Sequence, residues 1–311
     1  MKVLFILSGN RDKSSNLVMN QALSICSYNE NMEIDYFFVK GKGLSGYLKN
    51  VPPLREKIRS YNPDVVHAHY SFCGFLSFLS FSGKPVVTSL MGSDLHLKMH
   101  WRFILFVVSA FWRTTIVKSE TMQKKYLLSK TCVIPNGVDF NSYEPIEKGE
   151  ARKLLGLKLD KNYILFLADP ERPEKNFKLA KEACSLIRDE QIELLVINNI
   201  PHEQTRLYYY AVDVLILSSF YEGSPNVIKE AMVCNCPIVS TNVGDVASLF
   251  EGVEGNFISG YHAYDFSAKI QMALQFSRQK DRTRGREKIS GMGINAEKIA
   301  KKIYHIYQQI L

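Results

Sequence analysis

The stretch DVLILSSFYEGSPNVIKEAMVCNCPIVST (213–241) contains a strand, a tight turn, a helix and a second strand, in that order. Its first part (213–219) is apolar at nearly every position, which is typical of a strand buried on both faces of a sheet. The segment GSPN (223–226) follows as a turn, and the helix begins at Val227–Val233. The second strand is PIVST (237–241). Strands joined in this way run parallel, so the stretch predicts an α/β sheet covered by helices.

The same alternation of apolar runs and helical segments extends over nearly the whole chain and restarts after position 150. We therefore expect an α/β protein with two Rossmann-like domains, whose parallel sheets face each other across an interdomain cleft. The boundary is expected in the Pro-, Gly- and Asn-rich segment 134–150, giving domains 1–145 and 146–311. The last helix (296–311) can pack back on the first domain. The expected strands are 3–7, 34–39, 64–69, 85–90, 114–118, 132–135, 163–168, 192–197, 213–218, 237–241 and 256–259.

Composition excludes several classes of protein. Of 311 residues, 46% are apolar and 23% are charged, which does not indicate disorder. No apolar run reaches the roughly 18–20 residues that span a bilayer, and MKVLFILSGN (1–10) does not resemble a signal peptide. The six cysteines are expected to be reduced core thiols in the cytoplasm. Cys234 and Cys236 lack a second Cys/His pair at zinc spacing, so no metal site is predicted.

Two glutamates, Glu222 and Glu230, flank the turn in the opening stretch. The preceding strand would deliver Glu222 to the carboxyl edge of its sheet, where ligands bind in such folds. The N-terminus of the following helix suits a phosphate, and carboxylates suit the hydroxyls of a ribose or hexose. On spacing alone, the alternative that both are solvated surface charges stays open.

Six segments resemble, in the right order, the motifs of glycosyltransferase family 4, whose members are retaining enzymes of the GT-B fold with an E-x7-E signature. The segments are PDVVHAHY (63–70), TSLMGSDL (88–95), VIPNGVDFNSYEP (133–145), RPEKN (172–176), AVDVLILSS (211–219) and EGSPNVIKEAM (222–232).

The resemblance implies a donor site in the second domain. Glu222 and Lys175 would be catalytic: Glu222 would bind hydroxyls of the transferred sugar, and Lys175 would neutralise charge on the leaving group. Glu230 would bind the ribose of a nucleotide. The remaining donor-binding candidates are Arg172, Asn199, Gly223, Ser224, Pro225, Asn226 and Val227.

In the first domain the resemblance points to an acceptor-side group of residues. A glycine after the first strand permits close backbone approach. His69 ends another strand, and a structural, hydrogen-bonded histidine is an equally good interpretation. The candidates are Gly9, Asn10, His69, Gly92 and Asp94.

Two positions depart from the family pattern. Met91 stands where many members carry a histidine beside the transferred sugar. Asp169-Pro170 stands where the family has Gly-Arg ahead of the lysine. Arg172 could replace that arginine, because its guanidinium suits phosphate. The alternative is that Arg172 pairs with Glu171 or Glu174.

The first half of the chain is basic and aromatic. Up to position 150 there are 18 lysines and arginines against 12 acids. The segments 70–81 and 101–112 are apolar on all sides, so each must be buried or touch lipid. A basic, aromatic domain fits a peripheral enzyme at the inner face of the membrane, whereas plain solubility charge and core packing remain alternatives. The cluster RQKDRTRGREK (278–288) is expected to be a solvated, mobile surface segment.

The sequence thus predicts a retaining, metal-independent glycosyltransferase without cofactors, expected in cell-surface polysaccharide synthesis. Its donor would be a nucleotide sugar of the UDP or GDP type and its acceptor a glycan or lipid-linked glycan, with no nucleic acid as partner. The alternatives are a non-catalytic nucleotide-sugar-binding or scaffold subunit of a glycan-assembly complex, and a sugar-nucleotide epimerase on the same fold.

Overall fold

The computed structural model describes residues 1–9, 12–41, 43–126, 128 and 130–311, and the chain divides into two compact units. The first unit comprises Met1–Gly137 and Ala296–Leu311, and the second Val138–Asn295. The division lies inside the segment 134–150, slightly ahead of the boundary predicted between 145 and 146. The last helix belongs to the first unit.

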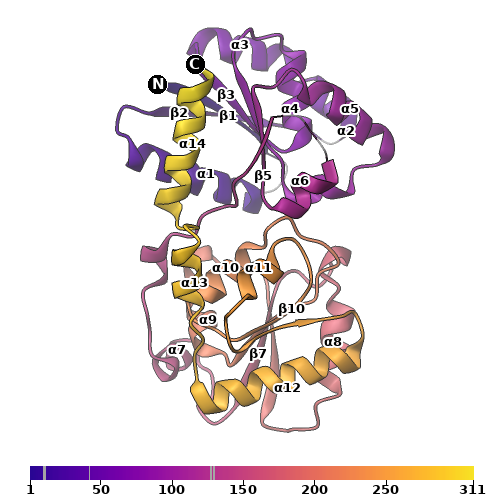
Figure 1. Ribbon diagram of the computed structural model, residues 1–311, viewed down its shortest axis with the longest axis vertical. Coiled ribbons are helices and arrows are strands. Elements are labelled where there is room, and N and C mark those ends of the chain that lie inside the picture. The colour runs from indigo at the N-terminus through magenta and orange to yellow at the C-terminus, as the bar shows by residue number, and fades with distance from the viewer. Residues whose placement is uncertain (10–11, 42, 127, 129) are drawn as a thin grey trace. The chain divides into compact units, whose positions relative to one another are not determined.

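The first unit contains a six-stranded parallel sheet in the order β2-β1-β3-β4-β5-β6 (Figure 1). Every strand pairs in parallel with its neighbour, as expected for strands connected through helices. The strands are β1 (Lys2–Ser8), β2 (Glu33–Val39), β3 (Val65–His69), β4 (Val86–Ser89), β5 (Thr114–Val117) and β6 (Thr131–Val133). The helices are α1 (Asp12–Tyr28), α2 (Gly43–Leu48), α3 (Val51–Tyr61), α4 (Ser71–Leu79), α5 (Met99–Ser109), α6 (Glu120–Tyr126) and α14 (Ala296–Ile310), with a 3-10 helix η1 (Gly92–His96).

Both faces of the first sheet are covered, because alternate side chains of each strand point to opposite faces. Leu4 and Ile6 of β1 pack in one core with residues of α3, α4, α5 and α6. Val3 and Phe5 pack in the other core with α1 and α14. Figure 1 shows α14 (yellow) beside α1 (indigo), so the two ends of the chain close the same face of this sheet.

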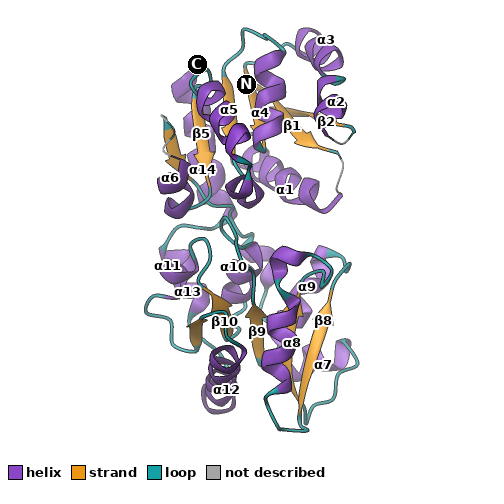
Figure 2. Cartoon of the chain, turned by 90° about the vertical axis from the view of Figure 1, so that its right-hand side faces the viewer, coloured by secondary structure: helices purple, strands orange, loops and turns teal. Residues whose placement is uncertain are grey.

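The second unit contains a five-stranded parallel sheet in the order β11-β10-β9-β7-β8, with β8 at one edge (Figure 2). The strands are β7 (Asn162–Leu167), β8 (Ile192–Ile197), β9 (Val214–Leu217), β10 (Ile238–Thr241) and β11 (Asn256–Ser259). The helices are α7 (Lys148–Leu154), α8 (Phe177–Ser185), α9 (His202–Ala211), α10 (Asn226–Val233), α11 (Val246–Phe250), α12 (Ala263–Lys280) and α13 (Gly285–Gly291), with 3-10 helices η2 (Phe140–Tyr143) and η3 (Pro173–Lys175).

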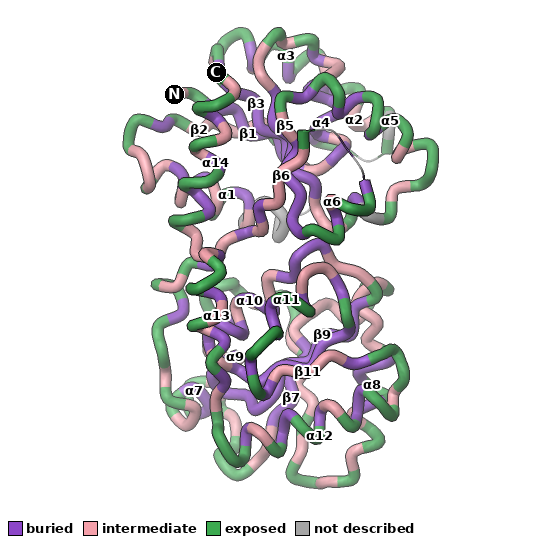
Figure 3. The backbone as a smooth tube through the Cα atoms, viewed as in Figure 1, coloured by how far each residue is buried: buried purple, intermediate pink, exposed green. Residues whose placement is uncertain are grey.

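The second sheet is also covered on both faces. Ile164 and Phe166 of β7 pack with α8 and α12, whereas Tyr163 and Leu165 pack with α9, α10 and α13. Figure 3 shows the strand β9 buried along its length and the helices exposed on their outer sides. The prediction of two parallel α/β sheets is confirmed. The predicted cleft between them stays a prediction.

The order of strands changes direction at one point in each sheet. In the second, β8 lies on one side of β7 and β9 on the other, so α8 and α10, which follow β7 and β9, cover opposite faces. Ligands of open α/β sheets bind at such switch points, beyond the carboxyl ends of the strands. The first sheet has the equivalent point between β1 and β3.

The basic segment 278–288 is only partly solvated, and the expectation was wrong for Arg282 and Arg286, which are half-buried. The Arg282 guanidinium donates to the carbonyl of Tyr209. Arg286 donates to the carbonyls of Tyr143 and Val233, at 2.8 and 3.1 Å. Because these arginines donate to backbone carbonyls of other segments, they hold α13 and the residues just before it against the rest of the second unit.

The first unit contains a buried hydrogen bond that links the end of the chain to the sheet. The Tyr307 hydroxyl lies 2.6 Å from Nδ1 of His67, and both residues are fully buried. We expect Tyr307→Phe to lower the free energy of unfolding by about 1–3 kcal/mol, because it leaves a buried ring nitrogen without a partner. Urea denaturation of the full chain measures this.

Tyr304→Phe is the matched control. Its hydroxyl accepts only a 3.3 Å hydrogen bond from Gln308 near the surface among the contacts of the described residues. Equal destabilisation by the two substitutions would contradict the role given to the His67–Tyr307 hydrogen bond.

Candidate functional site

Two loops at the switch point of the second sheet bring Lys175 and Glu222 together. Lys175 ends η3, in the loop after β7, and Glu222 lies in the loop after β9. The Lys175 Nζ lies 2.5 Å from Oε1 of Glu222, and the Ser219 hydroxyl donates to the same oxygen at 2.9 Å. The side chains are only 15% and 18% exposed, so this ion pair is partly shielded from solvent. The sequence prediction that both residues belong to one site agrees with this geometry.

The backbone of the two loops is also tied together. The Ser218 hydroxyl donates to the carbonyls of Lys175 and Asn176, and the Phe220 N–H donates to the carbonyl of Glu174 at 2.9 Å. Asn176 adopts a left-handed conformation (φ 48°) between η3 and α8, which asparagine tolerates better than most residues. The position of Lys175 is therefore set by backbone contacts as well as by its ion pair.

Arg172 forms an ion pair with Glu174, which is one of the two alternatives that the sequence leaves open. Its Nε lies 2.8 Å from Oε1 of Glu174. The guanidinium is 47% exposed, so it can still contact a ligand from the solvent side. The phosphate-binding role of Arg172 stays a prediction.

Glu230, in α10, is held by two residues of α9. The Tyr209 hydroxyl donates to Oε2 at 2.8 Å, and Nε2 of His202 lies 3.2 Å from Oε1. The hydrogen bond with Glu230 raises the pKa of His202. The Tyr143 hydroxyl lies 3.4 Å from the same nitrogen. Glu230 is thus neither a solvated surface charge nor mobile, because its side chain is 13% exposed.

The turn before α10 packs closely against the loop after β10. Gly244 has a φ of +60°, and a Cβ at this position would lie 2.7 Å from the carbonyl oxygen of Gly223, so only glycine fits. The Ser224 hydroxyl donates to Oδ2 of Asp245 at 2.7 Å. Because the Ser224 side chain is used for this contact, only its backbone N–H is left for a ligand.

The first turn of α10 offers hydrogen-bonding groups that the helix does not use. Pro225 is the N-cap and makes no side-chain cap. The first N–H groups of a helix have no partner within it, and together with the helix dipole they favour an anion. The N–H groups of residues 224–227 can donate to an anion, and phosphate binding there stays a prediction.

Lys229 is a residue of this region that the sequence analysis missed. It is fully buried in α10, and burial lowers its pKa to about 8. Burial also raises the pKa of Asp245, while the charge of Lys229 acts in the opposite direction. A lysine in the middle of an amphipathic helix gives no sequence signal of such burial, since lysines on helices are usually solvated.

The remaining donor candidate, Asn199, lies after β8. It adopts a left-handed conformation (φ 54°) and is exposed. Asn199 precedes α9, whose first residue is His202.

The acceptor-side candidates belong to the first unit. Gly9 follows β1 and donates to the carbonyl of Val39 at 2.9 Å. Asn10 lies outside the described residues. His69 ends β3, stacks on His67 with 4.2 Å between ring centres, and is 2% exposed. Among the described residues neither of its ring nitrogens has a hydrogen-bond partner. Burial lowers its pKa well below the usual value, so the ring is neutral.

Asp94 has a structural role in η1. Its carboxylate accepts from the N–H of Met91 at 2.6 Å and from the N–H of Ser71, at the start of α4, at 3.2 Å. The side chain is fully buried, and burial raises its pKa to about 6. Gly92 is the first residue of η1. Asp94 therefore ties the loop after β4 to the helix after β3.

The described residues include no group of three or more His, Cys, Asp or Glu side chains arranged to hold a metal ion. All six cysteines are free, and Cys234 and Cys236 are buried in the core, as expected. No described helix combines the length and apolar character needed to span a bilayer.

Comparison with known proteins agrees with the motif order. Residues 28–142 match Glycosyltransferase Family 4, and residues 196–275 match the family described as Glycosyl transferases group 1. The chain belongs to glycosyltransferase family 4.

Two curated relatives of this family 4 chain carry the names of glycosyltransferases. TuaC of Bacillus subtilis (strain 168), named for teichuronic acid biosynthesis, is 30% identical over 62% of the chain and 57% of TuaC. An Escherichia coli UDP-Gal:alpha-D-GlcNAc-diphosphoundecaprenol alpha-1,3-galactosyltransferase is 24% identical over 77% of the chain and 74% of that protein. The first two curated relatives are matched over 57% and 43% of their own length, which is less than two thirds.

Solved structures establish the fold as GT-B. Sucrose-phosphate synthase from Thermosynechococcus elongatus superposes with a TM-score of 0.84 at 16% identity, covering 99% of this chain and 98% of that one. Anabaena Alr3699/HepE, in complex with UDP and glucose, gives a TM-score of 0.79 at 16% identity, covering 99% and 100%.

Proposed function

We propose that this family 4 chain is a retaining glycosyltransferase that moves a sugar from a nucleotide-sugar donor to a glycan or lipid-linked acceptor, in cell-surface polysaccharide synthesis. The observation that carries the proposal is the Lys175–Glu222 pair at 2.5 Å, built by two loops at the switch point of the second sheet. The pair is partly shielded from solvent and lies at the carboxyl edge of the sheet, where ligands of open α/β sheets bind.

Each part of the nucleotide-sugar donor has residues of suitable chemistry to bind it. Glu230, fixed by Tyr209 and His202, would accept hydrogen bonds from the ribose hydroxyls. The N–H groups of residues 224–227 and the dipole of α10 would hold the diphosphate. Lys175 would move from Glu222 to the diphosphate oxygens, which frees the Glu222 carboxylate for the hydroxyls of the sugar. The donor is expected to be of the UDP or GDP type.

The transfer step needs stabilisation of the charge that develops on the leaving group. The bond between the anomeric carbon and the diphosphate oxygen breaks with its electron pair on the diphosphate, and Lys175 and the α10 N-terminus would stabilise that charge. The acceptor oxygen forms the new bond to the same face of the sugar, and its proton passes to the departing diphosphate. The residues supply this stabilisation without a metal or cofactor.

Membrane contact is proposed for the first unit. One side of α5 packs inward through Leu105 and Val108. The opposite side is exposed: Phe103, Phe106 and Phe111 are 69%, 58% and 65% exposed. Such a surface is typical of amphipathic helices that lie in the membrane interface.

Nucleotide binding by the second unit is testable by thermal shift. With a panel of UDP, GDP, ADP and their sugars, we expect one nucleotide at a hundred times its dissociation constant to raise the unfolding midpoint by about 5–10 °C. We expect Glu230→Gln to weaken binding of that nucleotide by about 10- to 100-fold, because a charge-assisted hydrogen bond is lost.

Glu254→Gln is the matched control, since it removes the same charge from a side chain that is 75% exposed and pairs with Lys280. It should bind the nucleotide like the unmodified chain. A flat response to every nucleotide would contradict the donor site and favour the non-catalytic scaffold role.

A further inference from the structure

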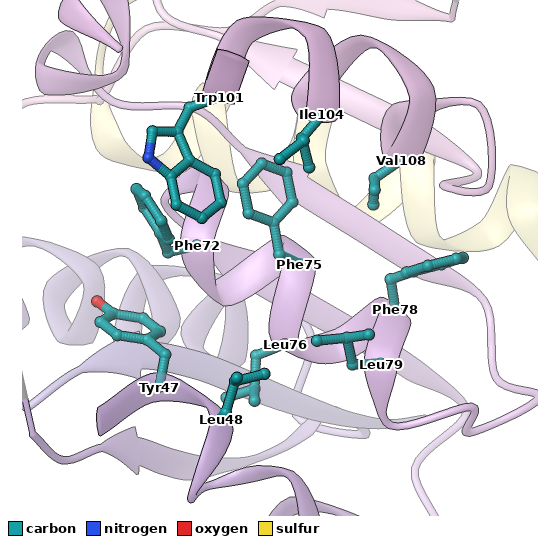
Figure 4. Close-up of a pocket in the computed structure, with 10 residues that line it drawn as sticks. All are labelled: Tyr47, Leu48, Phe72, Phe75, Leu76, Phe78, Leu79, Trp101, Ile104 and Val108. Atoms are coloured by element: carbon teal, nitrogen blue, oxygen red, sulfur yellow. The ribbon is translucent and has the colours of Figure 1, made fainter. Parts of the chain in front are cut away.

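An apolar groove in the first unit is formed by α2, α4 and α5 (Figure 4). It has a volume of about 260 Å³, and its lining is aromatic or aliphatic throughout, apart from the hydroxyl of Tyr47 and the indole N–H of Trp101. The lining residues are Tyr47, Leu48, Phe72, Phe75, Leu76, Phe78, Leu79, Trp101, Ile104 and Val108. A groove this apolar cannot satisfy a sugar or a phosphate, but it can bury a hydrocarbon chain.

The groove has a direction relative to the sheet. In a parallel α/β unit the helix after a strand starts at the carboxyl edge and runs back along the sheet. Phe72 lies in the first turn of α4 and Trp101 in the first turns of α5, and their rings contact at 4.7 Å. Tyr47 packs on Phe72, and its hydroxyl interacts with Ser8, the last residue of β1. One end of the groove therefore opens at the carboxyl edge, where His69 and Gly9 also lie.

The other end of the groove lies away from that edge. Phe78 and Leu79 at the end of α4 line it together with Val108 near the end of α5, as Figure 4 shows. From there the apolar surface continues on to exposed side chains: Phe81 is 73% exposed and Phe111 is 65% exposed. The ring of Phe111 packs on Phe78 at 4.9 Å, so the groove and the exposed surface are continuous.

Basic residues in and beside the helices that form the groove outnumber the acidic ones. The stretches 43–49, 71–84 and 98–113 contain five lysines and arginines and neither aspartate nor glutamate. These residues are Lys49, Lys84, Lys98, Arg102 and Arg113. Lys98 and Arg102 lie at the start of α5, on the side of the groove that opens at the carboxyl edge, whereas Lys84 and Arg113 follow the ends of α4 and α5 at the opposite edge. An apolar groove with positive charge at the carboxyl edge complements a molecule with a hydrocarbon chain and a multiply charged anionic head.

We propose that this groove holds the isoprenoid chain of a lipid-linked acceptor whose diphosphate head lies at the carboxyl edge of the first sheet. The inference rests on the proposed glycosyl transfer, since it names the class of acceptor. The chain enters beside Phe72 and Trp101 and leaves past Phe78 towards the exposed surface formed by Phe81 and Phe111. An acyl chain of the bulk bilayer is the competing occupant, but a phosphodiester head carries less charge than a diphosphate.

Binding of farnesyl diphosphate to the full chain, without any sugar donor, tests the proposal independently of transfer. Dimethylallyl diphosphate has the same head on a short chain, and calorimetry gives both affinities. We expect farnesyl diphosphate to bind at least about tenfold more tightly, since burying each additional CH₂ is favourable, and to change the fluorescence of Trp101. Trp101→Phe, which leaves only the buried Trp112, should lose most of that signal while binding persists.

Ile104→Trp fills the groove from a rim position that is 36% exposed, and should remove the difference between the two diphosphates. Leu23→Trp, on α1 and 63% exposed, is the matched control and should retain the difference. Equal affinity for the two diphosphates, or an unchanged difference in Ile104→Trp, would overturn the proposal. If lysophosphatidylglycerol bound in the groove as tightly as farnesyl diphosphate, the proposal would also be overturned, and the groove would be a site for bulk lipid. A thermal shift with a nucleotide but no binding of farnesyl diphosphate would support the proposed donor site and contradict only the proposed role of the groove.

Discussion

Substitution of Glu222 by glutamine should reduce kcat for sugar transfer by about 100- to 1000-fold while the chain stays folded. The Glu222 carboxylate is the group that would meet the sugar hydroxyls beside the reacting carbon, and preorganised groups of this kind contribute about 10²–10³ to kcat. Glutamine keeps the size of the side chain and the contact with Ser219, which lies 2.9 Å away. Steady-state release of nucleoside diphosphate gives kcat, and circular dichroism reports the fold.

Glu171→Gln is the control for this experiment, because Glu171 lies in the loop that carries Lys175 but is exposed. It should keep kcat within about twofold, as expected for a surface substitution away from the reacting groups. If Glu222→Gln turned over at the unmodified rate, the catalytic assignment of Glu222 would be wrong.

The second large effect is expected for Lys175→Met. In the proposed site the leaving diphosphate would lose the positive charge of Lys175, so kcat should fall by about 100- to 1000-fold. Lys178→Met is the matched control, since that side chain is 85% exposed on α8. A KM effect alone, with kcat unchanged, would mean that Lys175 only binds the donor.

The pair also predicts strong coupling between the two substitutions. Lys175 and Glu222 share an ion pair at 2.5 Å, so the double variant should lose far less than the product of the two single losses. Additive losses in the double-mutant cycle would show that the two residues act separately and would contradict a shared site.

Much of the fold is predictable from the sequence because the strands of a doubly covered parallel sheet are continuous apolar runs. DVLILSS and PIVST become β9 and β10, and the turn between them delivers Glu222 to the sheet edge. Lys175 and Glu222 are assigned to one site from the sequence through the resemblance of RPEKN and EGSPNVIKEAM to family 4 motifs, and both follow strands that end at the same edge.

The contacts that fix the site are not predictable, because they join segments without a local signal. His202 and Tyr209 reach Glu230 from another helix, and nothing in HEQTRLYYY (202–210) distinguishes them from solvated residues. Arg286 looks like part of a charged surface, yet it satisfies backbone carbonyls far away in the sequence. Burial of Lys229 likewise depends on what packs over α10, which sequence spacing does not specify.

The most direct test of the central claim is release of nucleoside diphosphate from a panel of nucleotide sugars, by the unmodified chain and by Glu222→Gln, with a lipid-linked glycan fraction as acceptor. We expect one nucleotide sugar to support release of nucleoside diphosphate by the unmodified chain, and the variant to release it about 100- to 1000-fold more slowly. Release at equal rates by both, or by neither with any donor, would contradict a donor site built on Lys175 and Glu222.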